Sequence, residues 1–444
     1  MCKMIYTLLL LSLTMVSSRP IPTTVKYGLS TYNYADADSK RSDGSKSFAD
    51  VIKSMSPGMM RFPSGSESSS YLWATAPEWV PSSHAPAFNT KSRWPNSDKT
   101  IVKNNKFVDA INFDEFMKNA ANSDVIITVN FDSMYADNGP SKELLVETAR
   151  QWVAYNKRMG YNVSYYEIGN ESDMPSTFNG RPSNGEQYAR DFIDFAIAMR
   201  AEDDSILIGM NGYYGDFMLD VFNIAGEYVD FVSMHSFPIY GFGNGYADYL
   251  SIGGYHYETY ERFLAAVDKS TMSQEKKDGM FVIVSETGTV DWAYINNDKP
   301  GWSGNTAGHM IALFDILGRI GEMKRVRGGI LAWVSHWHDV RDGHDTFSML
   351  DSFNQYKPTA YALWLWASLG DVEYVWREED DNVIKFMART AAGEKILIVN
   401  KRDVAQDIKI SMAFHADSPD TSVIHKTIDS DVLPAYSIAL CARS

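Results

Sequence analysis

Two glutamates, Glu171 and Glu286, stand where strand-like segments end, and they are the residues best placed to do chemistry. Segment 165–171 changes from apolar, β-forming residues to Gly-Asn-Glu, and segment 281–286 ends in a glutamate that Thr-Gly follows. Two carboxyl groups that face one sugar are the machinery of glycoside hydrolysis. The pair therefore predicts a glycosidase.

The two carboxyl groups are predicted to divide the work of a retaining hydrolysis, which needs them about 5 Å apart. Glu286 attacks the anomeric carbon, whereas Glu171 protonates the leaving oxygen and then activates the water that releases the product. The negative charge of Glu286 should raise the pKa of Glu171 and keep that acid protonated for the first step. The rate should then follow a bell-shaped curve against pH.

Short β-rich segments alternate with helical segments from Lys26 onward, and eight such units favour an α/β fold of the (β/α)8 TIM-barrel type. In this fold the carboxyl ends of the strands form the rim at which substrates bind. Glu171 ends the fourth predicted strand and Glu286 the seventh, so their side chains can converge across the mouth. The predicted strands are 27–32, 58–62, 125–130, 165–171, 206–211, 228–235, 281–286 and 329–334.

The sequence pattern changes after Glu373, where short β-type segments follow one another without a helical segment between them. We expect a small C-terminal antiparallel β-sandwich packed on the barrel, because no Pro/Ser-rich linker separates the two. Its predicted strands are 383–387, 395–399, 407–411 and 436–440. The expected division is a signal peptide at 1–18, a catalytic barrel at 19–370 and a β-sandwich domain at 371–444.

Two long loops are expected at the rim of the barrel. Segment 64–106 contains Trp73, Trp79 and Trp94, and segment 238–257 is rich in glycine and tyrosine. Long loops after barrel strands usually carry function, and exposed tryptophans there would stack on sugar rings. The alternative is that these tryptophans pack the loop onto the barrel.

Composition favours an exported globular protein. With 444 residues, 45% of them hydrophobic, the chain can bury a large core. Lys3, an apolar run and a small-residue site at 16–18 form a predicted secretory signal, and the net charge of −15 disfavours nucleic acid and anionic membranes as partners. Cys441 is alone once the signal is removed, so no internal disulfide is expected. Asn162 begins a glycosylation sequon, and a second one at Asn170 is expected to be inaccessible.

Three motifs resemble those of clan A retaining glycoside hydrolases, the superfamily of α-L-arabinofuranosidases, β-xylosidases, β-glucuronidases including heparanase, and several endo-glycanases. Segment 60–66 resembles their Arg-Phe-Pro-Gly-Gly-Ser signature after the second strand, with Ser64 in place of a glycine. Segment 166–171 is similar to their acid/base motif, and Ser285-Glu286 fits their nucleophile strand. The resemblance covers residues 27–444.

This resemblance makes Glu171 the acid/base and Glu286 the nucleophile. It implies that Asn170 binds the sugar 2-hydroxyl. It also implies that His235, with Tyr240 or Tyr257 beside it, orients the nucleophile. From the residues alone, a histidine at a strand end is as often a hydrogen-bonded structural residue.

The resemblance further implies supporting residues on other strands. Arg61 and Asn130 would support the site from the second and third strands, and Trp333 or Trp337 would form its floor at the eighth. A buried arginine such as Arg61 can also serve simply to neutralise a carboxylate, and the two roles overlap.

Two other classes of function are open on the sequence. One is a metal-dependent hydrolase or a structural cation site, because a single loop after the eighth strand carries His336, His338, Asp339, Asp342, His344 and Asp345. No His-Glu-x-x-His motif accompanies this cluster. The other is a carbohydrate-binding protein on an inactive barrel, against which the presence of both glutamates argues.

The sequence thus predicts a secreted retaining glycoside hydrolase that acts on a polysaccharide without a cofactor or a catalytic metal. The aromatic-rich loops after strands two and six favour endo action. An exo-acting enzyme of the arabinofuranosidase, xylosidase or glucuronidase type is the alternative.

Overall fold

The computed structural model describes residues 20–88, 102–136, 138–174, 184–241, 245–251, 257–291, 306–337, 347–380 and 383–441. The predicted signal peptide at 1–18 and Trp94 lie outside these residues. Among the helices described here, none is long and apolar enough to cross a membrane.

Eight parallel strands in this part of the chain close into a barrel, as predicted, because the first strand pairs with the last. Each strand pairs in parallel with its neighbours around the ring. In order they are β1 (Val25–Ser30), β2 (Met59–Phe62), β5 (Asp124–Val129), β6 (Val163–Ile168), β7 (Leu207–Asn211), β8 (Phe231–Gly241), β9 (Phe281–Asp291) and β10 (Val326–Ala332).

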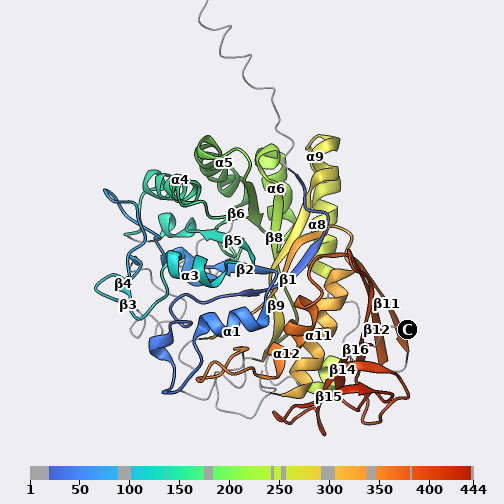
Figure 1. The fold of residues 1–444 in the computed structure, drawn as a ribbon. Coiled ribbons are helices and arrows are strands. Elements are labelled where there is room, and N and C mark those ends of the chain that lie inside the picture. Colours follow the sequence, from blue (N-terminus) through green and yellow to red (C-terminus); the bar gives the residue numbers. More distant parts are fainter. Residues whose placement is uncertain are drawn as a thin grey trace, which may run out of the picture.

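Helices return the chain between these strands and surround the barrel (Figure 1). Six of the described helices are capped by a side chain that accepts a backbone N–H of the first turn, from Ser47, Asn112, Ser141, Asn184, Ser273 and Thr306. The described helices are α1 (Phe48–Met55), α3 (Phe113–Asn119), α4 (Lys142–Met159), α5 (Gly185–Glu202), α6 (Gly215–Ala225), α7 (Tyr246–Leu250), α8 (Glu258–Lys269), α9 (Gln274–Gly279), α11 (Ala307–Gly321) and α12 (Pro358–Ala367).

The interior of the barrel is apolar at one end and polar at the other. The apolar end is one buried cluster from the strands, made of Met59, Ile126, Tyr165, Leu207, Phe231, Phe281, Ile283 and Leu331. Two residues further along five of these strands, toward the carboxyl rim, stand Arg61, Thr128, Glu167, Ser233 and Ser285, all buried. Side chains two apart on a strand share a face, so this polar layer sits directly under the rim.

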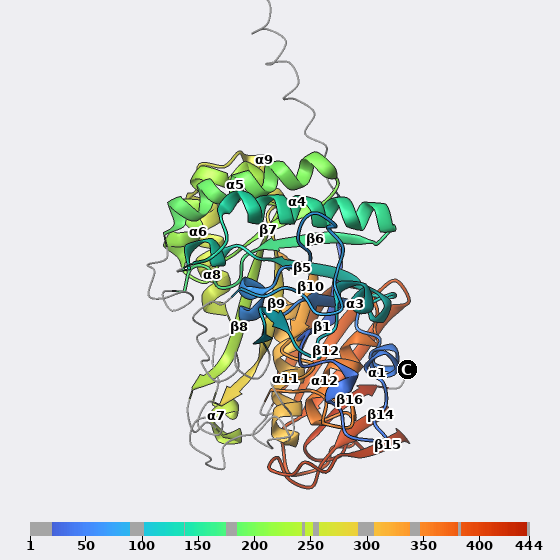
Figure 2. The same cartoon turned by 90° about the vertical axis from the view of Figure 1, so that its left-hand side faces the viewer.

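Antiparallel strands follow the barrel, as predicted, in the order β11-β12-β13-β16-β14-β15. Helix α11 packs against β11, β13 and β16 and so lies between the barrel and these strands (Figure 2). The ring of Phe386 meets Trp366 at 5.6 Å and Phe314 at 6.4 Å between centroids. The strands are β11 (Val372–Asp380), β12 (Val383–Thr390), β13 (Gly393–Asn400), β14 (Ile410–His415), β15 (His425–Ser430) and β16 (Ser437–Cys441).

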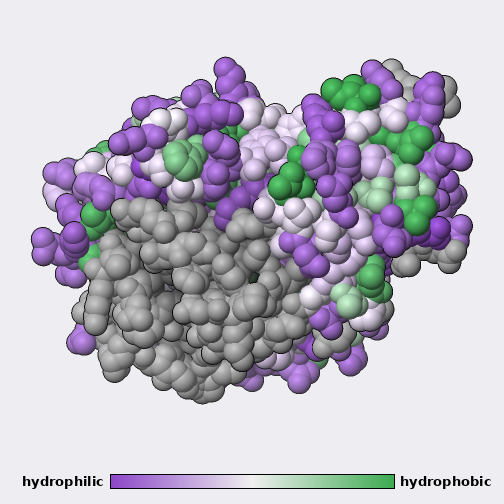
Figure 3. Space-filling model, turned by 90° about the horizontal axis from the view of Figure 1, so that it is seen from below, coloured by the Kyte–Doolittle hydropathy of each residue, from purple (hydrophilic) through white to green (hydrophobic). Residues whose placement is uncertain are grey.

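In the coloured part of the surface seen from below, hydrophilic side chains prevail, and most of the hydrophobic ones form separate patches on the right (Figure 3). Figure 1 places the C-terminal strands on this side. Exposed apolar residues of these strands and their loops include Val404, Val423, Ile428 and Val432.

The two long loops differ from their predictions. Strand β8 continues through segment 238–241, and α7 occupies part of the remainder, so segment 238–257 is not one loop. Segment 64–106 contains the short antiparallel pair β3 (Val102–Lys103) and β4 (Lys106–Phe107). Trp73 is fully buried, stacks on Trp152 at 5.8 Å and donates to a backbone carbonyl of α4, so the proposed stacking on sugar is wrong for this residue. Trp79 is partly buried against the core.

Candidate active site

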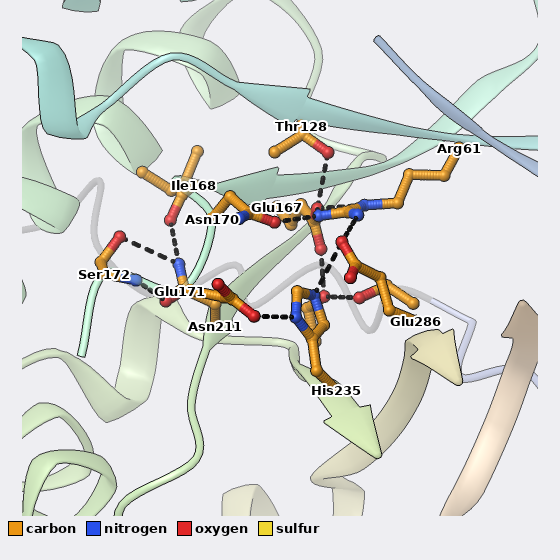
Figure 4. A network of polar contacts seen from close by, with 12 residues as sticks. Arg61, Thr128, Glu167, Ile168, Asn170, Glu171, Ser172, Asn211, His235 and Glu286 are labelled. Atoms are coloured by element: carbon orange, nitrogen blue, oxygen red, sulfur yellow. Dashed lines mark hydrogen bonds and ion pairs between the residues drawn. The ribbon is translucent and has the colours of Figure 1, made fainter. Parts of the chain in front are cut away.

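The two candidate catalytic carboxyl groups meet at the carboxyl rim of the barrel. Glu171 follows β6, and Glu286 lies within β9. One carboxylate oxygen from each, together with a ring nitrogen of His235 from β8, lie within 4.8 Å of one another. Figure 4 shows the three side chains pointing toward a common point. This separation matches the roughly 5 Å between the carboxyl groups of retaining glycosidases.

A bulge in β9 turns Glu286 inward. Met234 pairs with Val284, but the next residue, His235, pairs with Glu286, so Ser285 is an extra residue in β9. Ser285 bonds Ser233 of the polar layer at 2.6 Å, so consecutive residues of β9 both face the barrel interior. Bulges of this kind often re-aim a side chain beside an active site.

The turn that presents Glu171 has an unusual backbone. Gly169 has a φ of 81° and Glu171 a φ of 50°. A non-glycine residue in this left-handed region costs about 1–3 kcal/mol and needs support from its surroundings. That support comes from two neighbouring strand ends: the Ser172 N–H donates to Asn211 at 2.7 Å, and its hydroxyl donates to Asp132 at 2.8 Å. The strained position of Glu171 is therefore held from both sides.

Arg61 of β2 lies in the polar layer and bonds residues of both glutamate-bearing strands. Its side chain is fully buried. Its Nε donates to Glu167 at 2.6 Å, one terminal nitrogen donates to Asn170 Oδ1 at 2.6 Å, and the other bonds Glu286 Oε1. The predicted supporting role and the predicted neutralising role of Arg61 thus coincide in one fork of hydrogen bonds (Figure 4).

His235 lies between the two candidate catalytic carboxyl groups. Its Nδ1 is 3.0 Å from Glu171 Oε1, and its Nε2 is 3.5 Å from Glu286 Oε1. The residue therefore contacts both members of the pair, whereas the sequence assigned it to Glu286 alone.

Burial and charge act against each other on these groups. Burial raises the pKa of Glu286, and the charge of Glu171 adds to this rise, which His235 and Arg61 offset only in part. Burial would lower the pKa of His235, but the carboxylates of Glu286 and Glu171 outweigh it and raise that pKa. Both shifts follow from crowding ionisable groups in a small buried site. The predicted rise in the pKa of Glu171 stays a prediction.

An aromatic wall borders Glu286 on the other side. A Cβ atom added to Gly65 would lie 2.7 Å from Glu286 Oε1 and 3.0 Å from the Trp333 ring, so both side chains lie close to this glycine. Trp333 meets Trp337 edge to face at 5.7 Å, and both rings contact Tyr32. Of the two predicted floor residues, Trp333 is the one that lies close to Gly65 beside Glu286, and Trp337 packs against Trp333.

Asn130 makes hydrogen bonds that join neighbouring loops of this site. Its amide nitrogen donates to the Tyr71 carbonyl at 3.1 Å, and its oxygen accepts from the Ser133 hydroxyl at 2.5 Å. These two bonds tie the end of β5 to the loop after β2. They give Asn130 a defined role without contact to Glu171 or Glu286, and its predicted contact with substrate stays a prediction.

The two tyrosines expected beside His235 lie in different places. Tyr240 stands near the end of β8 and is 57% exposed, with its ring 6.2 Å from that of Phe237. The Tyr257 hydroxyl lies 3.5 Å from Glu322, which follows α11. The structure thus gives Tyr257 a contact outside the carboxylate cluster.

A small cavity opens beside Glu171 and His235, and its lining includes Asp173 and Tyr213. Asp173 accepts the backbone N–H of Tyr214 at 2.9 Å and is buried. Burial raises the pKa of Asp173, and the nearby charge of Glu171 adds to the rise. The aspartate ties the segment after Glu171 to the loop before α6.

Glu171, His235 and Glu286 offer three ligand atoms with a spacing that a metal ion could use. Arg61, however, already holds one oxygen of Glu286 and places a fixed positive charge against the cluster. A second cation there would be repelled at short range. This donor set therefore suits proton transfer better than metal binding.

His336, at the start of the alternative metal loop, lies among the described residues. His336 is buried, and its Nδ1 lies 2.7 Å from Asp36, which also accepts the Ser335 hydroxyl. This histidine is part of a polar contact between the loops after β1 and β10. The other members, His338, Asp339, Asp342, His344 and Asp345, lie outside the described residues.

Several residues that build the site were not singled out from the sequence. They are Thr128, Glu167, Asn211, Ser233 and Ser285, which form or flank the polar layer. The sequence did contain a signal for Glu167. It stands two residues after Tyr165 on the same strand, and side chains two apart on a strand face the same side. The hydroxyl residues carry no such signal, since serine and threonine are common in strands of every kind.

Solved structures of glycoside hydrolases superpose on nearly the whole chain. An α-L-arabinofuranosidase from Thermotoga maritima in an arabinose complex gives a TM-score of 0.64 at 16% identity, over 95% of this chain and 97% of that chain. A family 51 α-L-arabinofuranosidase from Bifidobacterium longum gives 0.64 at 15% identity, over 95% and 96%. The chain has the fold of clan A glycoside hydrolases. A family 44 xyloglucanase from Paenibacillus polymyxa gives 0.57 at 12% identity, over 95% and 99%.

The fold resemblance predicted from the motifs is thereby confirmed for nearly the whole length of the chain. No protein-family model matches the sequence. No curated protein matches it. Because identities of this size concern the clan A fold alone, the chemistry of this chain has to be inferred from its own site.

Proposed function

We propose that this protein is a retaining glycoside hydrolase with Glu171 as acid/base and Glu286 as nucleophile. The observation that carries the proposal is the spacing of the pair: their nearest carboxyl oxygens lie within 4.8 Å at the rim of a barrel. Inverting enzymes separate these groups by roughly 6.5–9.5 Å to admit a water molecule. The measured spacing supports direct attack by a carboxylate.

In this proposal each of the two steps of the hydrolysis is carried out by a named residue. Glu286, held by Arg61, attacks the anomeric carbon while Glu171 gives its proton to the leaving oxygen. Esterification removes the charge of Glu286, so Glu171 can now keep a charge of its own and take a proton from water. His235, in contact with both carboxyl groups, holds them in register through both steps.

We propose a polysaccharide substrate and endo action. The paired ends of β8 and β9 extend six residues past His235 and five past Glu286, with Ile239 opposite Thr289, and form a wall at the rim. Tyr240 on this wall exposes 57% of its surface, which suits contact with sugars beyond the one being cleaved. Exo action on a terminal sugar is the alternative, and product sizes from a polysaccharide digest distinguish the two.

Secretion is also a proposal and rests on the predicted signal at 1–18. Mass spectrometry of the exported protein should find a mature start after residue 18. In a glycosylating host, Asn162 should be modified because it is exposed between α4 and β6, and Asn170 should not because it is buried. A glycan on Asn170 or export without cleavage would contradict these expectations.

The function is tested with a panel of aryl glycosides and polysaccharides, followed by proton NMR of the first product. The proposal expects turnover with retention of the anomeric configuration. Glu171→Gln should lower kcat on a poor leaving group by about 10²–10⁴-fold and much less on a dinitrophenyl glycoside, which needs no proton. Inversion, or binding of glycans without turnover by any member of the panel, would overturn the proposal.

A further inference from the structure

A third glutamate, Glu167, lies under the catalytic pair and has no role in the steps above. It is fully buried in β6, in the polar layer of the barrel. Its Oε1 accepts from Arg61 Nε at 2.6 Å and from the Thr128 hydroxyl at 2.6 Å, and its Oε2 accepts from the Ser233 hydroxyl. Both of its oxygens thus accept hydrogen bonds from side-chain donors, one of which is the charged guanidinium of Arg61.

Arg61 lies between this carboxylate and the nucleophile. The bond from Glu167 to Nε orients the guanidinium plane, and the two terminal nitrogens then reach Glu286 and Asn170. A guanidinium is rigid and planar, so fixing one edge fixes the others. The position of the nucleophile therefore depends on Glu167 through Arg61.

The charges of the buried cluster balance only when Glu167 is included. In the protonation state with Glu171 neutral and His235 as the imidazolium, the charges of Arg61 and His235 balance those of two carboxylates, Glu167 and Glu286. When Glu286 becomes an ester the cluster has one surplus positive charge, which favours ionised Glu171, the form needed as base. Without Glu167, that surplus would already exist before substrate is cleaved.

We propose that Glu167 is a positioning residue that fixes Arg61 toward Glu286 and Asn170, and that its carboxylate, bonded to Arg61, offsets the positive charge that would otherwise favour loss of the Glu171 proton before the glycosyl ester forms. This inference rests on the proposed function and assigns that site a residue which acts through Arg61 rather than on the sugar.

The test is the pH dependence of kcat/KM for Glu167→Gln, a variant that preserves shape and removes the charge. The full charge of Arg61 then acts on Glu286. The acid limb of the curve of kcat/KM against pH, where activity rises as Glu286 ionises, should therefore move to lower pH by about 0.5–1 unit. The basic limb should move down as well, because Glu171 loses its proton more easily beside a surplus positive charge. A merely structural role predicts a lower Tm with both limbs in place, and that result would overturn the proposal.

Two kinds of control separate charge from packing. Thr128→Val and Ser233→Ala each remove one hydrogen bond to Glu167 and keep its charge, so both limbs should stay where they are. Glu322→Gln neutralises a carboxylate that bonds Arg377 at 2.8 Å outside the site, and it should leave kcat/KM at every pH unchanged. Limbs that shift equally in these controls would contradict the charge argument.

If Glu167→Gln fails to fold, Glu167→Asp provides the test. This variant keeps the charge but shortens the reach to Arg61, so kcat should fall at least tenfold while both limbs hold their positions. Wild-type kcat in a folded Glu167→Asp would overturn the positioning role.

A second measurement needs no turnover and therefore fails separately from the proposed function. The His235 ring is titrated by NMR in wild type and in Glu167→Gln, with its signal assigned by its loss in His235→Asn. Removal of the nearby anion should lower the titration midpoint of His235 by about 0.5 unit or more. An inactive wild type would refute the hydrolase, whereas an unmoved His235 midpoint would refute the role of Glu167.

Discussion

Replacing Arg61 by lysine tests whether the fork of hydrogen bonds under the site is needed for catalysis. Lysine keeps the positive charge, but an ammonium cannot reach Glu167, Glu286 and Asn170 with fixed geometry. At least two of the three bonds should be lost, and a hydrogen bond to a charged group contributes about 1.5–3 kcal/mol. The free energy of unfolding should thus fall by about 3–6 kcal/mol.

The number of hydrogen bonds lost in Arg61→Lys also gives the expected change in kcat/KM. Loss of the one bond to Glu286 removes about 1.5–3 kcal/mol from the stabilisation of the reacting nucleophile, which corresponds to a fall in kcat/KM of roughly 10- to 150-fold. The assays are urea denaturation and hydrolysis of an activated aryl glycoside.

Arg319→Lys is the matched control. Arg319 also bridges two carboxylates, Asp315 at 2.7 Å and Glu379 at 3.1 Å, but outside the site. This variant should lose stability and keep kcat/KM. Arg61→Lys with wild-type stability and wild-type kcat/KM would refute the reasoning.

Three further predictions concern the neighbours of the nucleophile. Gly65→Ala should lower kcat by about 100-fold with little change in Tm, because its methyl group would lie 2.7 Å from Glu286 Oε1 and displace it; wild-type kcat would contradict this. The acid limb of kcat/KM should lie above the ordinary pKa of glutamate, because the pKa of Glu286 is raised and the nucleophile must be ionised. His235→Asn removes a cation that holds this pKa down, so the limb should move to higher pH, and a downward shift would count against the assignment. A chelator such as EDTA should leave activity unchanged, since Arg61 already occupies the charge position of a metal; loss of activity that Zn²⁺ or Ca²⁺ restores would contradict it.

Much of the barrel could be predicted because alternation of β-rich and helical segments is a local pattern. All eight predicted strands overlap strands of the barrel. The main error is β8, which was expected to stop at His235 but continues past Pro238 to Gly241. Proline is excluded from the middle of regular strands, but here the register between β8 and β9 shifts around this position, and the pairing resumes beyond it. Such a shift depends on the neighbouring strand and leaves no trace in the local sequence.

The C-terminal strands were harder to predict for a similar reason. Predicted segment 407–411 overlaps β14 only at its start, and β11 and β15 were missed. Strand β15 has the charged and polar sequence of an edge strand and pairs only with β14 in the described part of the chain. Edge strands bury little surface, so they show weak hydrophobic alternation.

Both catalytic candidates were identified from the sequence, because a glutamate at the end of an apolar β-run is conspicuous. Their surroundings were not, since contacts such as Arg61 with Glu167 join residues 106 positions apart. The bulge at Ser285 is equally invisible, because it is a property of strand pairing. For Trp73 the sequence left two alternatives open, because an aromatic residue in a long loop has the same local sequence whether it faces sugar or the barrel.

The central claim is that Glu286 forms a covalent bond with the sugar. The direct measurement is incubation with a 2-fluoro glycoside or epoxide inactivator of the preferred sugar, followed by proteolysis and mass spectrometry of the labelled peptide. We expect one sugar per chain, on Glu286, in wild type, and no labelling in Glu286→Gln. A label on another residue, or turnover without any covalent intermediate, would contradict the account.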